Sequence, residues 1–255
     1  MYIDLNSDLG ESFGNYKIGN DAEVMKYITS ANIACGFHAG DPLIIEKTLQ
    51  LAIENKVALG AHPGYPDLVG FGRRSLKLSN EELSSSIKYQ VGAVQSMAKS
   101  LGARLQHVKL HGAMYNDLAF DYERAKKAAE AIAGIDADLI FVGLAGSDMI
   151  QAAKDAGLKT ANEFFADRAY NDDGALVSRS IKGSVIHDTK VCMERIEKLI
   201  KTGAVLSINH KEIKIKADTI CVHGDNENAV EFVRNLNQFL KEKGIELKNL
   251  KGLNL

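Results

Sequence analysis

The stretch ANIACGFHAGDP, residues 31–42, decides the fold of this chain. It continues an apolar segment, Ile28 to Cys35, of the kind that fills a sheet, and then starts a helix with Asp41 as N-cap and Pro42 in the first turn. A strand that passes through a short loop into a capped helix places the polar side chain of that loop, here His38, at the carboxyl edge of a sheet. That edge is where α/β proteins bind their ligands.

The same strand–loop–helix pattern recurs along the chain. Seven strands are predicted near residues 2, 31, 57, 106, 139, 158 and 219, each followed by a helical stretch. This alternation implies parallel strands with helices outside, and the absence of a GxGxxG turn argues against a Rossmann sheet. Polar residues follow six strands, and they can meet only if the strands close into a ring: Asp8, His38, His62, Lys109, His111, Glu163 and His223. The sequence therefore predicts an α/β fold, a seven-stranded parallel (β/α) barrel.

Length and composition limit the class of protein. The chain has 255 residues, 45% of them hydrophobic and 25% charged, with a net charge of −2, so we expect one barrel domain over 1–255 with a small β-hairpin excursion near 204–216. No basic field indicates nucleic acid, and no apolar run reaches the roughly 20 residues of a membrane span. The three cysteines form no CxxC pair, and the acidic N-terminus does not resemble a signal peptide. These features predict a cytoplasmic protein with a small-molecule substrate.

The first polar cluster follows a strand predicted over Tyr2–Leu5. Asn6, Asp8 and Glu11 lie there beside Gly10, a composition typical of a site, although turn and capping carboxylates have the same composition. We expect Asp8 and Glu11 to be functional.

The second cluster lies in GAHPGYPD, residues 60–67, and GFGRR, residues 70–74. Prolines just past the strand predict rigid loops that hold His62 and Asp67. A guanidinium fork matches a carboxylate or a phosphate, so Arg73 or Arg74 could clamp an anion, and the other one of the pair would face solvent or an ion-pair partner.

Two further clusters follow later strands. Lys109 lies in a short strand, and because an isolated buried ammonium costs several kcal/mol, it should face a carboxylate of the protein or of a ligand. His107, on the same face but deeper, is expected to be a core histidine. Glu163 and Arg168 follow the sixth strand, and His223 follows the last one, beside Asp225, which is a candidate helix cap.

Together these motifs resemble one known family. DLNSDLGE at 4–11, ANIACGFHAGDP at 31–42, GAHPGYPD at 60–67, GFGRR at 70–74, VKLHGAMYN at 108–116, EFFADRAY at 163–170 and CVHGDN at 221–226 are similar, in order and over nearly the full length, to the LamB/YcsF family. The resemblance implies a seven-stranded barrel of the glycoside hydrolase/deacetylase type. It also implies the A subunit of an ATP-dependent 5-oxoprolinase, which works with partner subunits B and C and forms L-glutamate, ADP and phosphate from 5-oxo-L-proline, ATP and two waters.

On this interpretation the chain binds and hydrolyses an activated lactam. It has no GxxxxGK[ST] motif, so we expect ATP, the cosubstrate, to be bound largely by or together with the partners. Asp8 or Glu11 would act as base, a histidine as acid, base or ligand, and Lys109 or Arg168 would hold the substrate carboxylate. The predicted catalytic residues are Asp8, Glu11, His38, His62, Lys109 and His111, and the predicted substrate-binding residues are Asn6, Arg74, Glu163, Arg168 and His223.

Three alternatives remain open from the sequence. Asp8, His38 and His62 could bind a divalent metal such as zinc or manganese, a set similar to that of barrel deacetylases. The chain could then be a metal-dependent amidohydrolase or deacetylase that acts on a small amide or sugar without ATP. It could also be a non-catalytic binding protein of the assembly, which the convergence of so many polar strand ends makes less favoured.

Overall fold

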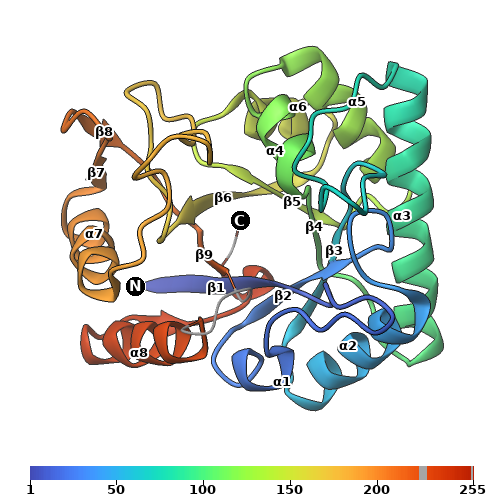
Figure 1. Cartoon of the computed structure of the whole chain (residues 1–255), viewed down its shortest axis with the longest axis horizontal. Coiled ribbons are helices and arrows are strands. Elements are labelled where there is room, and N and C mark those ends of the chain that lie inside the picture. The colour runs from blue at the N-terminus through green and yellow to red at the C-terminus, as the bar shows by residue number, and fades with distance from the viewer. Residues whose placement is uncertain (224–228, 254) are drawn as a thin grey trace.

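The computed structural model describes residues 1–223, 229–253 and 255, and in this part of the chain seven parallel strands close into a barrel (Figure 1). Around the ring they are β1 (Tyr2–Leu9), β2 (Ser30–Ala34), β3 (Ala58–His62), β4 (His107–Lys109), β5 (Ile140–Leu144), β6 (Lys159–Phe165) and β9 (Thr219–His223). The ring closes because β9 pairs in parallel with both β6 and β1. The predicted seven-stranded barrel is confirmed.

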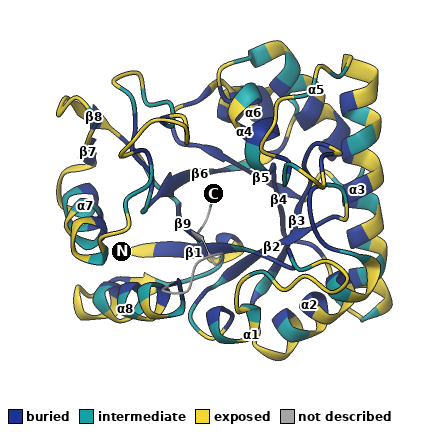
Figure 2. Ribbon diagram, in the orientation of Figure 1, coloured by how far each residue is buried: buried dark blue, intermediate teal, exposed yellow. Residues whose placement is uncertain are grey.

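Helices surround the barrel, and their outer faces are exposed whereas the strands are buried (Figure 2). They are α2 (Pro42–Glu54), α3 (Asn80–Ser100), α5 (Tyr122–Ala133), α6 (Asp148–Asp155), α7 (Thr189–Thr202) and α8 (Ala229–Glu242), with short α1 (Asp21–Val24) and α4 (Gly112–Ala119) in loops. The predicted start of α2 is confirmed, because the Asp41 side chain accepts hydrogen bonds from two backbone N–H groups of the first turn and Pro42 opens the helix.

The first strand is longer than the sequence pattern suggested. The prediction that it ends at Leu5 is wrong, since β1 continues to Leu9 and carries Asn6 and Asp8 within it. In a strand alternate side chains point to opposite faces, and here the apolar set packs outward in the hydrophobic core while the polar set points into the barrel. The polar residues that looked like a loop are therefore the inner face of a strand. Glu163 is likewise inside β6, not after it.

A hydrogen-bond network fills the lower part of the barrel. The Asp4 carboxylate accepts hydrogen bonds from the hydroxyls of Thr29 (2.8 Å) and Ser30 (2.6 Å) on the β2 side and of Thr219 (2.5 Å) on β9. Burial raises the pKa of Asp4 to about 6. Buried polar groups are tolerated when they are bonded in this way, so the network replaces an apolar barrel core.

His107 occupies the middle of the barrel, where a core histidine was expected. Its Nε2 lies 2.8 Å from Asn32 Oδ1, and the ring is fully buried. The neighbouring strand makes room with glycine, because a Cβ at Gly60 would overlap the His107 ring.

Peripheral segments complete the described part of the fold. The pair β7 (Ala204–Leu206) and β8 (Glu212–Lys214) is antiparallel and lies where the hairpin is expected. β10 (Glu246–Leu247) pairs with the start of β1, and the 3-10 segment η1 (Leu250–Leu253) places Leu250 against Ile140 and Ala161 near the amino ends of β5 and β6. Among the described residues, no helix has the length and apolar character needed to cross a membrane.

Candidate active site

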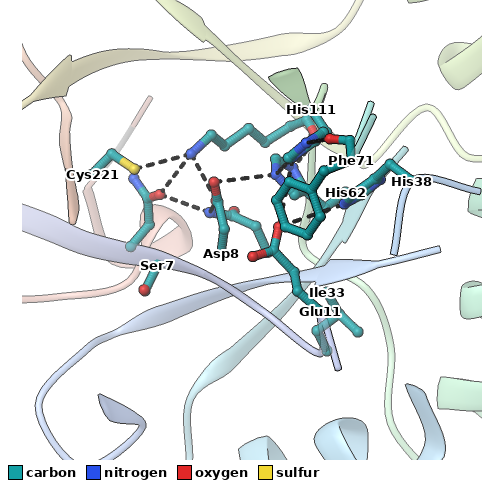
Figure 3. A network of polar contacts seen from close by, with 12 residues as sticks. Ser7, Asp8, Glu11, Ile33, His38, His62, Phe71, His111 and Cys221 are labelled. Carbon is teal, nitrogen blue, oxygen red and sulfur yellow. Dashed lines mark hydrogen bonds and ion pairs between the residues drawn. The ribbon is translucent and has the colours of Figure 1, made fainter. Parts of the chain in front are cut away.

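A cavity of about 630 Å³ opens at the carboxyl ends of the strands. Its floor is made by five of the six residues predicted as catalytic: Asp8, Glu11, His62, Lys109 and His111. Figure 3 shows these side chains, from the ends of β1, β3 and β4 and from the loops that follow them, pointing toward one another. The barrel therefore brings together residues that lie up to a hundred positions apart in the chain.

Lys109 lies at the centre of the floor and meets the predicted carboxylate partner. Its Nζ is 2.9 Å from Asp8 Oδ1 and 2.9 Å from Glu163 Oε1, and 3.1 Å from Cys221 Sγ. Burial by itself lowers the pKa of Lys109, but the charges of Asp8 and Glu163 outweigh it and raise the pKa well above its ordinary value. Lys109 is thus an ammonium that fixes one oxygen of Asp8 and leaves the other directed at His62.

Two backbone carbonyls fix the proton positions of His62 and His111. His62 Nδ1 lies 2.7 Å from the Lys109 carbonyl, and His111 Nε2 lies 2.9 Å from the Phe71 carbonyl. A carbonyl only accepts, so these nitrogens are the donors and the opposite nitrogens carry lone pairs. His62 Nε2 and His111 Nδ1 then face each other at 3.0 Å, with Asp8 Oδ2 3.2 Å from His62 Nε2.

Three acceptor atoms that converge in this way repel one another unless a positive centre lies between them. A proton or a metal cation satisfies that requirement. Burial, followed by the neighbouring His38 and His62, lowers the pKa of His111 well below its ordinary value, so the pocket strongly disfavours a permanent charge on this ring. The arrangement is therefore suited to accept a proton transiently or to hold a cation.

His38 lies behind this floor and does not line the cavity. Its ring stacks on His111 with centroids 3.7 Å apart and planes 3° from parallel. Gly72 has φ +61, and a Cβ there would stand 2.7 Å from the Cβ of His38, so the loop can cover the ring only with glycine. His38 Nε2 lies 3.5 Å from Glu11 Oε1, and burial, with the charge of His62 next, lowers the pKa of His38 well below its ordinary value. His38 is a neutral ring that supports His111.

The histidine and glutamate cluster can hold a metal ion. Glu11, His38, His62 and His111 each present one ligand atom, and these atoms lie within 4.8 Å of one another. The stacking of His38 on His111 limits that set, because an ion in the plane of one ring lies well outside the plane of the other. The orientation therefore favours Glu11, His62 and His111, whereas the predicted set was Asp8, His38 and His62.

The predicted substrate-binding residues are distributed over different depths. Asn6 and Glu163 lie beneath the floor, bonded to Thr219 and Lys109, and do not line the cavity. Arg168 does line it. His223 pairs with Asp8 in the strand register, but its side chain, like Asp225, lies outside the described residues.

Arg74 is not at the cavity. Its guanidinium pairs with Asp67, and its side chain is 65% exposed, whereas Arg73 lines the cavity. This side-chain placement answers the question left open for the arginine pair, with Arg74 as the ion-paired member.

Other lining residues were not singled out from the sequence. Tyr115 and Asn116 come from α4, and the segment Leu176–Ile181 comes from the connection between β6 and α7. The signal available for this segment was its length, because long connections without regular structure in compact domains are usually functional.

Comparisons with known proteins agree with this architecture. The sequence model described as the LamB/YcsF family matches residues 3–254. A relative from Alkaliphilus metalliredigens is 55% identical over 254 residues, and one from Thermococcus sibiricus is 55% identical over 253 residues; each alignment covers 99% of both chains, and both relatives are named as the A subunit of 5-oxoprolinase. The crystal structure of a lactam utilization protein from Thermus thermophilus superposes with a TM-score of 0.91 at 41% identity, covering 97% of this chain and 99% of that one. The chain therefore belongs to the LamB/YcsF family.

Proposed function

We propose that this chain is the ring-opening component of an ATP-dependent 5-oxoprolinase and that it acts with partner subunits B and C. The names of its relatives supply the substrate and the assembly. The observation that carries the chemistry is the convergence of Asp8, His62 and His111 on the floor of a cavity large enough for a small lactam.

The reaction explains why such a floor is useful. A five-membered lactam is a stable amide, so its opening requires an activated carbonyl, a deprotonated water and a protonated ring nitrogen. Transfer of a phosphoryl group from ATP to the carbonyl oxygen gives the activated carbonyl. One water then opens the ring to an acyl phosphate, and a second water releases phosphate, which accounts for the two waters of the overall reaction. ATP is bound by, or shared with, the partner subunits.

The geometry gives each floor residue a defined task. His62 Nε2, whose lone pair faces the cavity side of the floor, takes the proton from water and returns it to the ring nitrogen as the C–N bond breaks. The Lys109 carbonyl holds that imidazole in one tautomer, while the Lys109 ammonium orients Asp8 beside it. Arg168 binds the carboxylate of the lactam.

A divalent cation is compatible with the same floor. Glu11, His62 and His111 would hold it, and when bound it would polarise the lactam carbonyl. This site also suits the second candidate function, a metal-dependent hydrolysis of a small amide without ATP. Metal analysis of the purified chain and activity after chelation separate the two: the proposed function survives metal removal or requires both metal and ATP, whereas the second candidate requires metal alone.

The direct test is glutamate release from 5-oxoproline, measured with this chain alone and with subunits B and C, each with and without ATP. We expect glutamate only in the complete mixture with ATP. Release by the chain alone without ATP, or none in the complete mixture, would contradict the proposal.

A further inference from the structure

Arg168 is a buried cation whose hydrogen bonds go only to neutral groups. It is 4% exposed, and its guanidinium donates to two backbone carbonyls, from Nε to Ser184 (3.3 Å) and from Nη2 to Val177 (2.7 Å). In the described part of the chain it forms no ion pair. A buried charge without a counter-charge is costly, and Arg168 lines the cavity, so a bound anion would complete its environment.

Two more guanidinium groups line the same cavity. Arg73 comes from the loop after β3 and lies over the Phe71 ring, with its Cζ 4.8 Å from the ring centroid. Arg179 comes from the connection that follows β6. Both are close enough to Arg168 that, after burial, their positive charges contribute to lowering its pKa to about 10. Three like charges on one wall favour an anionic ligand.

The cavity is electrically divided. The carboxylates Asp8 and Glu11 come from β1 and the residues after it, with Lys109 and the histidines beside them at the floor, whereas the three arginines come from the loops above. The other lining acid, Asp117, accepts hydrogen bonds from the hydroxyls of Tyr65 (3.0 Å) and Ser75 (2.8 Å). A ligand that reacts at the floor therefore directs its negative groups toward the arginine wall.

The arginine wall also carries hydroxyl donors suited to tetrahedral anions. Ser178 and Ser180 flank Arg179, line the cavity and lie 2.9 Å apart through their Oγ atoms. Because Arg168 bonds the carbonyls of Val177 and Ser184, it fixes the segment that presents these groups. A carboxylate of a small lactam occupies one guanidinium fork, so a wall with three forks has capacity for a second anionic group.

We propose that Arg73, Arg168 and Arg179 form a phosphoryl subsite, which binds the phosphate of an activated lactam while the reacting carbon lies at the floor. This inference rests on the proposed function, because it names the form in which the substrate reaches this chain: phosphorylated elsewhere and bound here as a multiply charged anion. It makes this chain the acceptor of a phosphorylated intermediate, not of ATP.

The test uses inorganic phosphate as probe and the full-length chain, with binding followed by isothermal titration calorimetry. We expect saturable phosphate binding that weakens at least about tenfold in Arg179→Met and in Arg73→Met, and less in Arg179→Lys, which keeps the charge but loses the fork. Arg104→Met is the matched control: Arg104 is exposed, precedes β4 at the opposite end of the barrel, and its loss should leave phosphate binding unchanged. Circular dichroism spectra check that each variant is folded.

The outcomes separate the subsite from the proposed function. If the wild-type chain does not bind phosphate, or if acetate binds with the same affinity and the same dependence on arginine, the phosphoryl subsite is wrong even when the complete complex forms glutamate. If phosphate binds in the expected way but the complex forms no glutamate from 5-oxoproline and ATP, the subsite stands and the proposed reaction is wrong.

Discussion

At the scale of single residues, the chemistry of this site depends on which nitrogen of each imidazole is protonated. The Lys109 carbonyl decides this for His62, and the Phe71 carbonyl decides it for His111. Neither contact involves a catalytic side chain, so a loop backbone determines where the lone pairs point. The result is a preformed proton acceptor that needs no reorganisation when substrate arrives.

His62→Ala should therefore abolish ring opening without unfolding the barrel. Loss of a general acid–base group typically costs about a hundredfold or more in kcat. The measurement is glutamate release by the complete complex, with thermal unfolding of the isolated chain as a folding check. His187→Ala, at an exposed histidine that does not line the cavity, is the control and should keep full activity. Activity of His62→Ala near the wild-type rate would exclude the role given to this residue.

The Asp67–Arg74 pair should contribute to stability, not to substrate binding. Arg74 lowers the pKa of Asp67 to about 2, from an ordinary value of 3.8. A carboxyl with a depressed folded-state pKa stabilises the fold above pH 3.8, and that contribution is lost as the pH falls toward 2. Asp67→Asn should lower Tm at pH 7, and the difference from wild type should vanish near pH 2. A difference that is constant across this range would show that the ionised pair is not its source.

At the scale of elements, the inner faces of the strands determine how tightly the barrel closes. β3 approaches β4 closely because Gly60 has no side chain at the height where β4 presents His107. The polar faces of β1 and β2 then reach this histidine through Asn32. A bulky inner residue on β3 would separate strands that the hydrogen-bond network requires to be adjacent.

Gly60→Ala should lower the free energy of unfolding by about 1–3 kcal/mol, because the added methyl would overlap the His107 ring and the surrounding structure must shift. Gly92→Ala is a control of opposite sign: this glycine lies within α3 and a Cβ there meets nothing within 4 Å, so the substitution should stabilise by up to about 1 kcal/mol. Urea unfolding of both variants measures the two effects. Equal stability of the two variants would contradict this account of strand packing.

At the scale of the whole molecule, the barrel is closed by pairing its first strand with its last one. β1 and β9 run side by side from the Asp4–Thr219 pair to the Asp8–His223 pair. Asp4 links this seam to β2 through Ser30, so one buried carboxyl connects three strands. The stability of the closed barrel therefore depends on the protonation of Asp4.

The pKa of Asp4 is raised to about 6, so its stabilising contribution is complete below pH 3.8 and is lost as the pH rises through 6. Across this interval the free energy of unfolding should fall by up to roughly 3 kcal/mol for this group. Asp21, whose pKa burial also raises to about 6, adds a contribution of the same sign. Asp4→Asn should therefore reduce this slope without abolishing it, as measured by urea unfolding at several pH values. An unchanged slope would mean that Asp4 does not titrate in this interval.

Local signals were sufficient to predict the elements and most of the floor. The N-cap at Asp41 and the capping box at Ser79 and Glu82 act within a few residues, so helix starts were predictable. Strand ends were less so, because a polar inner face in β1 has the same composition as a loop. The position of Arg74 could not be predicted, since Arg73 and Arg74 are adjacent and chemically equivalent, and only the fold of their loop separates them.

The sequence by itself determined the closed barrel, the strand ends that carry polar groups, and the family, because periodicity, caps and motif order are properties of neighbouring residues. Only the tertiary structure decided that His38 supports His111, that Glu163 neutralises Lys109 from below, and that three arginines share one wall of the cavity. The physical reason is that burial, tautomer and charge pairing depend on distances between residues far apart in the chain, and those distances exist only once the strands have closed.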